Sequence, residues 1–339
     1  MKARKTKRGL VLLLIPLFAS VGSSFLFPSS PFEQPIFANG PCDGTLQELD
    51  QSTRAFEEAI LDRIPRFAKR AAQFIAPVPR KVTVWLPPGY HNSSLAQSYP
   101  VLYCHDGQNV VSDSESWTGH SWRLTGALCS LVRRNLLEPH QCPIVVLIPS
   151  SVDDYVVPFV RRRHVEYESS LLGQTYVDIV ANTIKPMVDS QFRTLSSPEH
   201  TMTIGSSMGG QVALQSALRH PDKFGGAAAL SPFISASVLA DLALMPAKLR
   251  SKKIYIDNGG DIDDIRVPLL DVLDHIPHWN PGYFWLDTQL QPGIDAARAI
   301  LDFHRVPYKY AKFPGGRHNE RAWAMRIDKP LLYLFGDME

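Results

Sequence analysis

The chain has 339 residues, of which 45% are hydrophobic and 20% are charged, and its formal net charge is +2 at pH 7. That length and composition allow one large hydrophobic core or two smaller ones. Because there is no broad excess of Lys and Arg to hold phosphates, we expect no nucleic-acid partner.

The first residues have the pattern of an export signal. Apolar residues 10–18 and then small residues follow a basic stretch made of Lys2, Arg4, Lys5, Lys7 and Arg8, which is the order found in signal peptides. Cleavage is expected near Gly22, with Ala38 as the other candidate. An uncleaved segment could serve as a membrane anchor, although Pro16 makes it a poor span. We therefore expect residues 1–38 to be a signal peptide and linker, and the protein to be secreted or periplasmic. An organelle transit peptide is the alternative.

Four cysteines occur, namely Cys42, Cys104, Cys129 and Cys142. In an oxidising compartment they allow two disulfides in three possible pairings. Cys104 lies in an apolar run and fits a buried thiol. The favoured pair is Cys129 with Cys142, because these two residues flank one helix-to-strand connection.

Strand and helix patterns alternate along the chain. A helical pattern covers residues 46–74 and is divided by Pro65. Strands are predicted at 81–86, 101–105, 144–148, 201–204, 226–230, 253–257 and 308–313. Helices are predicted at 122–137, 174–192 (with a kink at Pro186), 211–219, 292–304 and 320–335. This order predicts one α/β domain over residues 44–339, with a mostly parallel central sheet and helices on both faces.

A G-x-S-x-G pentapeptide, Gly205-Ser206-Ser207-Met208-Gly209, lies between the 201–204 strand and the 211–219 helix. In that context it predicts the nucleophile elbow of an α/β-hydrolase fold, a tight turn that exposes Ser207 Oγ. The backbone N–H of Met208 is then one oxyanion donor. The second is expected from Gln108, in the loop after the 101–105 strand, where Gly107 allows the chain to turn.

A serine nucleophile needs a general base, and the base needs a carboxylate to orient it. His318 is the expected base, because it follows the last predicted strand, where this fold delivers its histidine. The acid is expected just after the 253–257 strand, where Asp261 has the best reach. Asp263 is a rival, and Asp257 could instead hold the turn. The spacing of these carboxylates does not match an EF-hand, so we expect no metal.

Several motifs jointly resemble one known family. They are Trp85-Leu86-Pro87-Pro88-Gly89-Tyr90, His105-Asp106-Gly107-Gln108-Asn109, the pentapeptide itself, His220-Pro221-Asp222 and His318-Asn319-Glu320. Over about residues 81–335 the chain is similar to the putative esterase family of α/β-hydrolases, which includes enterochelin esterases, feruloyl esterases, S-formylglutathione hydrolases and mycolyltransferases. The resemblance implies the hydrolase fold, Ser207 as nucleophile, His318 as base, and oxyanion amides at Gln108 and Met208.

The chain departs from the family at the acid, because relatives carry one acidic residue near this strand end and this sequence offers several. Arg163, Glu166 and Tyr167 also resemble a family segment at the mouth of the active site, with a structural ion pair as the alternative. His105 and Asp106 are expected to shape the oxyanion loop.

The sequence therefore predicts an exported serine carboxylesterase that needs no cofactor and acts on a small-molecule or glycan-linked ester. An acyltransferase with the same triad is one alternative, since an alcohol can intercept an acyl-enzyme. A non-catalytic binding protein on a hydrolase fold is another. Residues 265–292 are predicted to form a lid. Four tryptophans could line a sugar platform or pack in the core, namely Trp117, Trp122, Trp279 and Trp285.

Overall fold

The computed structural model describes residues 37–63, 78–92, 97–151, 155–157, 160–168, 171–260, 286–314 and 316–336. All of them belong to one compact unit, residues 35–339. The signal and linker predicted for residues 1–38 therefore lie almost wholly outside the described residues, as does most of the predicted lid. Among the described helices, none has the length and apolar character needed to cross a membrane.

The central sheet has eight strands in the order β1-β2-β4-β3-β7-β8-β9-β10. Their bounds are β1 Thr45–Glu48, β2 Thr83–Leu86, β3 Val101–His105, β4 Ile144–Ile148, β7 Thr201–Ser206, β8 Gly226–Leu230, β9 Lys253–Asn258 and β10 Lys309–Lys312. In this sheet order the strands β4, β3, β7, β8, β9 and β10 pair in parallel. At the other edge, β1 pairs antiparallel with β2, and β2 pairs antiparallel with β4. The prediction of a mostly parallel sheet is confirmed.

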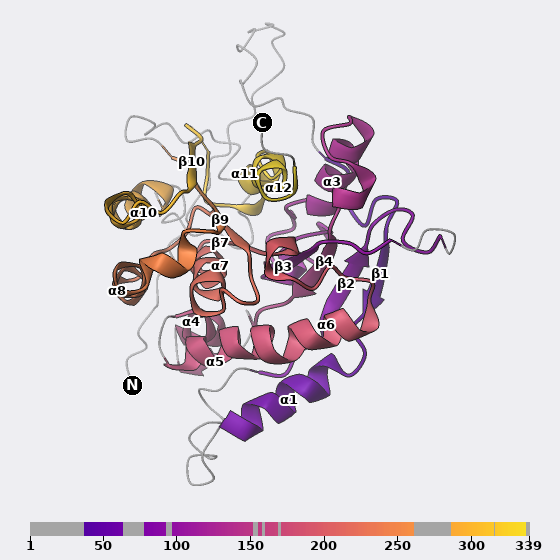
Figure 1. Ribbon diagram of the computed structural model, residues 1–339, viewed down its shortest axis with the longest axis horizontal. Coiled ribbons are helices and arrows are strands. Elements are labelled where there is room, and N and C mark those ends of the chain that lie inside the picture. The colour runs from indigo at the N-terminus through magenta and orange to yellow at the C-terminus, as the bar shows by residue number, and fades with distance from the viewer. Residues whose placement is uncertain are drawn as a thin grey trace, which may run out of the picture. The chain divides into compact units, whose positions relative to one another are not determined.

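Helices cover both faces of this sheet (Figure 1). One face carries α3 (Leu124–Arg133), α11 (Glu320–Ala324) and α12 (Asp328–Phe335). The other carries α1 (Ser52–Arg63), α5 (Leu171–Ile179), α6 (Lys185–Gln191), α7 (Met208–Arg219), α8 (Ala236–Leu244) and α10 (Leu286–Phe303). A short hairpin of β5 (Tyr155–Val157) and β6 (Val160–Arg161) leads into α4 (Arg162–Tyr167).

Two hydrophobic cores lie on the two faces because side chains alternate along each strand. In β3, Val101 and Tyr103 belong to the core under α5 and α7, whereas Leu102 and Cys104 belong to the core under α3 and α12. All of these side chains are fully buried. Their burial fixes the register in which the strands pair. The register in turn determines where the loops after β3, β7 and β9 begin at the edge of the sheet.

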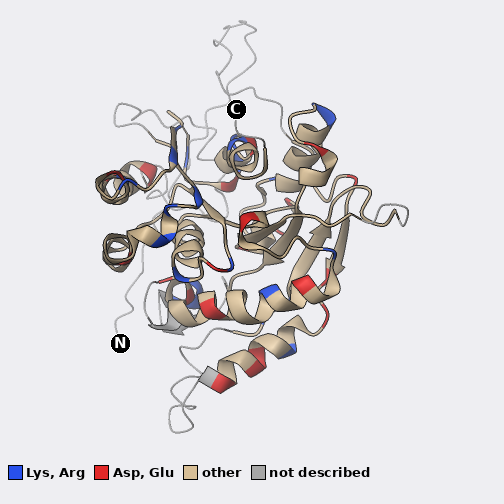
Figure 2. Ribbon diagram, viewed as in Figure 1, with Lys and Arg blue, Asp and Glu red and all other residues tan. Residues whose placement is uncertain are grey.

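Acidic and basic side chains are interspersed along the described helices rather than gathered by sign (Figure 2). In α6, for example, Lys185 Nζ lies 2.7 Å from Asp189 Oδ2 one turn away. This distribution agrees with the low net charge.

Three predicted elements differ from the structure. The start of the 46–74 helix is strand β1, whose exposed side chains give no packing that would fix a helix there. The helix predicted from Pro292 is already helical at Leu286, and Pro292 lies inside α10, where it removes one backbone hydrogen bond without ending the helix. The closing helix divides into α11 and α12. A kink was expected at Pro186; the structure has a π-helical turn over Val180–Ile184, just before that residue.

Candidate active site

Ser207 sits in the turn between β7 and α7 with φ 54° and ψ −124°. Positive φ is unfavourable for a residue with a Cβ, so the surrounding contacts must hold it there. The backbone supplies them, since Ser207 N–H donates to Leu230 O (2.9 Å) and Phe233 N–H donates to Ser207 O (3.0 Å). Ser207 is partly exposed, whereas its neighbour Ser206 is buried.

Gly205 is needed because the turn is so tight. A Cβ at this position would lie 2.2 Å from the carbonyl oxygen of Gly209. The sequence prediction of an elbow between a strand and a helix is thus matched by the local geometry, with Met208 as the first residue of α7. The N–H of a first helical residue has no partner within the helix and can bind an anion.

The loop after β3 carries the second expected oxyanion residue. Asp106 has φ 58° and precedes a short 3-10 turn over Gly107–Asn109. Gly107 is required there, because a Cβ would lie 2.5 Å from the backbone nitrogen of Ile148. The Gln108 side chain is fixed to Ser150, donating to its Oγ (3.1 Å) and accepting from its N–H (3.0 Å).

Asp106 anchors the loop after β3 through its side chain and its backbone. Its carboxylate accepts two hydrogen bonds from Arg163, from Nε (2.7 Å) and from an Nη (2.6 Å), and it is 2% exposed. Its backbone N–H donates to the Tyr167 hydroxyl (3.1 Å). Glu166 forms a separate buried ion pair with Arg80 (2.6 Å). Arg163 and Tyr167 thus support the loop after β3, whereas Glu166 belongs to a structural ion pair with Arg80.

His105 also has a structural role. Its ring nitrogens lie 3.0 Å from the Tyr176 hydroxyl and 3.0 Å from Thr203 Oγ1. Burial lowers the pKa of His105 to about 4, against a weaker opposing effect of Asp106. A neutral, doubly bonded imidazole is consistent with the loop-shaping role expected for His105.

His318 lies in the loop between β10 and α11, as predicted, and is 5% exposed. Its Nδ1 lies 2.7 Å from Asp287 Oδ1. The ring makes an edge contact with Trp323, with centroids 5.0 Å apart. The other ring nitrogen, Nε2, is the one that can exchange a proton with a nucleophile when Nδ1 is held by a carboxylate.

Sequence reasoning missed Asp287. It lies in the first turn of α10 and is 2% exposed. Asn258, the last residue of β9, donates from Nδ2 to the Asp287 backbone oxygen (2.8 Å). Gly259 passes so close that a Cβ there would lie 2.3 Å from Asp287 Oδ2. The end of β9 thus lies next to Asp287, the carboxylate that contacts His318. The sequence prediction places Asp287 in the 265–292 lid segment, before the helix expected from Pro292, so no local pattern marks it.

Of the acids expected at this strand end, Asp257 lies among the described residues. Asp257 accepts hydrogen bonds from the Ser231 N–H (3.0 Å) and from Arg326 (3.2 Å). Burial raises the pKa of Asp257, and the charge of Arg326 opposes that increase. Asp257 therefore holds the turn after β8, whereas the alternative expected from the sequence was the turn at the end of its own strand. Asp261 and Asp263 lie outside the residues that the structure describes.

The electrostatics of Asp287 favour its charged form. Burial raises the pKa of the carboxyl, but hydrogen bonding and charge attraction from His318, together with the charge of Arg326, outweigh burial and leave the pKa below its ordinary value. An ionised Asp287 can hold the His318 ring in one tautomer and stabilise the imidazolium.

A second buried carboxylate, Glu320, lies two residues after His318 and is 3% exposed. It accepts hydrogen bonds from Asn109 Nδ2 (3.2 Å), Trp117 Nε1 (3.0 Å) and Thr118 Oγ1 (3.0 Å). Burial raises the pKa of Glu320 to about 7, against these hydrogen bonds. Glu320 thus connects the histidine loop to the loop that carries Gln108. Sequence reasoning quoted it only as part of a motif.

Comparisons with known proteins agree with this architecture. The model of the family described as "Putative esterase" matches residues 76–334. The uncharacterized protein YbbA of Bacillus subtilis (strain 168) is 21% identical over 159 residues, which are 45% of this chain and 56% of that protein. The chain therefore aligns with little more than half the length of this curated relative.

Solved structures of esterases share the fold. A ferulic acid esterase superposes with a TM-score of 0.53 at 19% identity, covering 76% of this chain and 93% of that chain. The ferulic acid esterase of the anaerobic fungus Anaeromyces mucronatus gives 0.53 at 19% identity, with coverages of 77% and 85%. The enterobactin esterase of Shigella flexneri gives 0.52 at 18% identity, with coverages of 76% and 55%. At these identities the likeness shows the fold alone.

Proposed function

We propose that the chain, which belongs to the putative esterase family, is a carboxylic ester hydrolase with Ser207, His318 and Asp287 as its catalytic triad. The observation that carries the proposal is the 2.7 Å contact between His318 Nδ1 and Asp287 Oδ1, in a chain whose serine elbow has the strained backbone of a nucleophile. Asp287 replaces Asp261, the acid expected from the sequence.

The mechanism follows from these roles. His318 Nε2 takes the proton of Ser207 Oγ while the oxygen attacks the ester carbonyl, and Asp287 stabilises the imidazolium that forms. The N–H groups of Met208 and Gln108 bind the oxyanion. The alcohol leaves with a proton from His318, and water then hydrolyses the acyl-enzyme with the same histidine as base.

Labelling with a fluorescent fluorophosphonate tests the nucleophile. Wild type should be labelled, whereas Ser207→Ala and His318→Ala should not. Ser206→Ala is the matched control, because Ser206 is the buried neighbour in β7, and it should be labelled like wild type. A folded wild-type protein that takes no label would favour a non-catalytic binding protein on this fold.

Hydrolysis of an ester panel should then separate substrate classes. Feruloyl and dihydroxybenzoyl esters belong in the panel beside short acyl esters, because proteins of the same fold are named ferulic acid esterase and enterobactin esterase. Product analysis with and without a sugar acceptor distinguishes hydrolysis from acyl transfer. Acylated sugar as the main product would favour the acyltransferase.

We also propose that residues 1–38 direct export, on the basis of the basic and apolar pattern of the first 18 residues. N-terminal sequencing of the mature protein from a cell fractionation tests this. A new N-terminus near residue 22 or 38 in the exported fraction is expected, and an intact Met1 in the cytoplasmic fraction would contradict it.

A further inference from the structure

The segment before β1 meets α3 at a group of thiols that the proposed catalytic mechanism does not use. Cys42 Sγ, an Asp43 carboxylate oxygen and Cys129 Sγ all lie within 4.8 Å of one another. Cys142 lines a pocket beside Cys129. All four cysteines of the chain are free thiols in the structure. We propose that Cys42 and Cys129 form a disulfide that ties the segment before β1 to α3.

This pairing differs from the Cys129–Cys142 pair favoured from the sequence. Cys142 Sγ does not join the group in which Cys42, Asp43 and Cys129 are mutually close. It is 2% exposed, and burial raises the pKa of its thiol. Cys42 is only partly buried, so an oxidant can reach it. Burial, followed by the hydrogen bond with Cys42, raises the pKa of Cys129 to about 12. Cys42 is therefore the thiol that reacts first, and Cys129 is the partner within reach.

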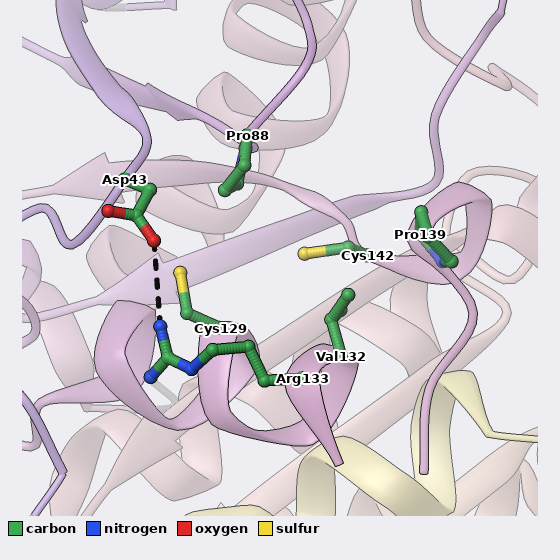
Figure 3. A pocket seen from close by; sticks show the side chains of 7 residues that line it. All are labelled: Asp43, Pro88, Cys129, Val132, Arg133, Pro139 and Cys142. Atoms are coloured by element: carbon green, nitrogen blue, oxygen red, sulfur yellow. Dashed lines mark hydrogen bonds and ion pairs between the residues drawn. The ribbon is translucent and has the colours of Figure 1, made fainter. Parts of the chain in front are cut away.

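A pocket of about 110 Å³ lies beside the pair (Figure 3). Its lining includes Asp43, Cys129, Arg133 and Cys142. Figure 3 shows the Cys142 sulfur directed toward the side of the pocket that Cys129 occupies.

Arg133 argues against a metal ion at the same three ligands. Its Nη1 lies 3.7 Å from Cys42 Sγ and 3.5 Å from Asp43 Oδ2. A guanidinium in contact with two of the three ligands already neutralises them and would repel a divalent cation. The cluster is better suited to thiol oxidation than to metal binding.

The segment that carries Cys42 is hydrogen-bonded to α3 and to β2. Thr125 Oγ1 of α3 donates to Gly40 O (2.7 Å), and Trp85 Nε1 donates to Pro41 O (2.8 Å). These two hydrogen bonds hold the residues just before Cys42 in place, so the two sulfurs stay within 4.8 Å of each other. A bond between Cys42 and Cys129 would close a loop of more than 80 residues, since 129 − 42 = 87. Long loops gain the most from such closure.

Glutathione disulfide can serve as the oxidant. Cys42 thiolate attacks one of its sulfurs and releases glutathione thiolate, and Cys129 then displaces the second glutathione as the protein S–S bond forms. Two protein S–H bonds are lost, two electrons reduce the glutathione disulfide, and two glutathione thiols result. The protein loses two hydrogen atoms in mass.

Peptide mapping of the purified mature chain tests the proposal. After equilibration in glutathione redox buffer, free thiols are alkylated in denaturant and the digest is analysed by mass spectrometry. The expected result is a linked Cys42–Cys129 peptide, with Cys104 and Cys142 alkylated. A Cys129–Cys142 link, or four alkylated cysteines in fully oxidising buffer, would overturn the proposal.

Cys142→Ser is the matched control and should form the same linked peptide. Cys42→Ser should leave Cys129 alkylated. Oxidised wild type and oxidised Cys142→Ser should each melt about 5 °C above their reduced forms, and Cys42→Ser should show no such difference. These measurements do not involve ester turnover. The disulfide proposal can therefore be contradicted without contradicting the proposed triad, and the reverse.

Discussion

His318 Nδ1 and Asp287 Oδ1 lie 2.7 Å apart, although the two residues are separated by 31 positions and come from different structural elements. The histidine follows β10, whereas the carboxylate belongs to the first turn of α10. Asn258 at the end of β9 hydrogen-bonds the Asp287 backbone. The end of β9 therefore positions Asp287, the proposed acid, through the side-chain amide of Asn258.

Asp287→Asn should lower kcat by about three to four orders of magnitude with a smaller change in KM. The amide nitrogen cannot accept from His318 Nδ1–H, so it favours the tautomer in which Nε2 carries the proton and cannot act as a base. Steady-state kinetics on an activated aryl ester measure the effect.

Asp261→Asn and Asp257→Asn are the comparison variants for this prediction. Asp261→Asn should retain near wild-type kcat. Asp257→Asn should act mainly on stability, because Asp257 is fully buried against Arg326 and Ser231. A loss of kcat in Asp261→Asn as large as in Asp287→Asn would return the role to the acid expected from the sequence.

Ser207→Gly should be more stable than Ser207→Ala by about 1 kcal/mol, and both should be inactive. Ser207 has φ 54° and ψ −124°, a conformation that glycine adopts without steric cost and alanine does not. Chemical denaturation of the two variants measures the difference. Equal stabilities would mean that the elbow is not strained.

Much of the fold could be predicted from the sequence because buried parallel strands have a strong local signal. The bounds of β3, β4 and β8 agree with the predicted ranges to the residue. The elbow was equally local, since the pentapeptide and its flanking elements specify one turn. His318 was predictable because the loop after the last strand has a fixed place in the sheet order.

The carboxylate that contacts His318 was not predictable in the same way. Asp287 approaches His318 from α10, whose position depends on packing against α8 and on contacts with residues distant in the sequence, among them Asn258. None of these contacts has a local sequence pattern. Strand β1 was missed for a similar reason, because its exposed side chains carry no periodic signal and it is defined by pairing with β2.

Arg163→Met should lower kcat by about 10- to 100-fold while the protein stays folded. The variant removes both hydrogen bonds to Asp106, whose carboxylate then stays buried without its charge partner next to the loop that carries Gln108. Arg54→Met on the exposed face of α1 is the control, since Arg54 forms only a surface pair with Glu58, and its kcat should be unchanged. An unchanged kcat in Arg163→Met would show that the loop holds its shape without the ion pair.

Glu320→Gln should keep the fold and the activity but change how stability depends on pH. A glutamine oxygen can accept from Asn109 and Trp117, and its NH₂ can donate to Thr118 Oγ1, whose own proton can go to the His120 carbonyl (3.1 Å). Glu320→Ala offers none of these partners. It should lose about 2–4 kcal/mol of stability and lower kcat through the loop that carries Gln108.

The direction of the pH effect follows from the raised pKa of Glu320, which moves from 4.5 to about 7 on folding because of burial. Below pH 4.5 the carboxyl is protonated in both states. Between pH 4.5 and 7 the unfolded chain loses this proton and the folded chain keeps it, so wild-type stability falls as pH rises, by on the order of 3 kcal/mol in total. Glu320→Gln lacks this contribution, so its stability relative to wild type should increase over that range and then level off. Denaturation midpoints of both proteins from pH 4.5 to 8 measure the difference, and a constant difference would mean that Glu320 keeps its ordinary pKa in the folded protein.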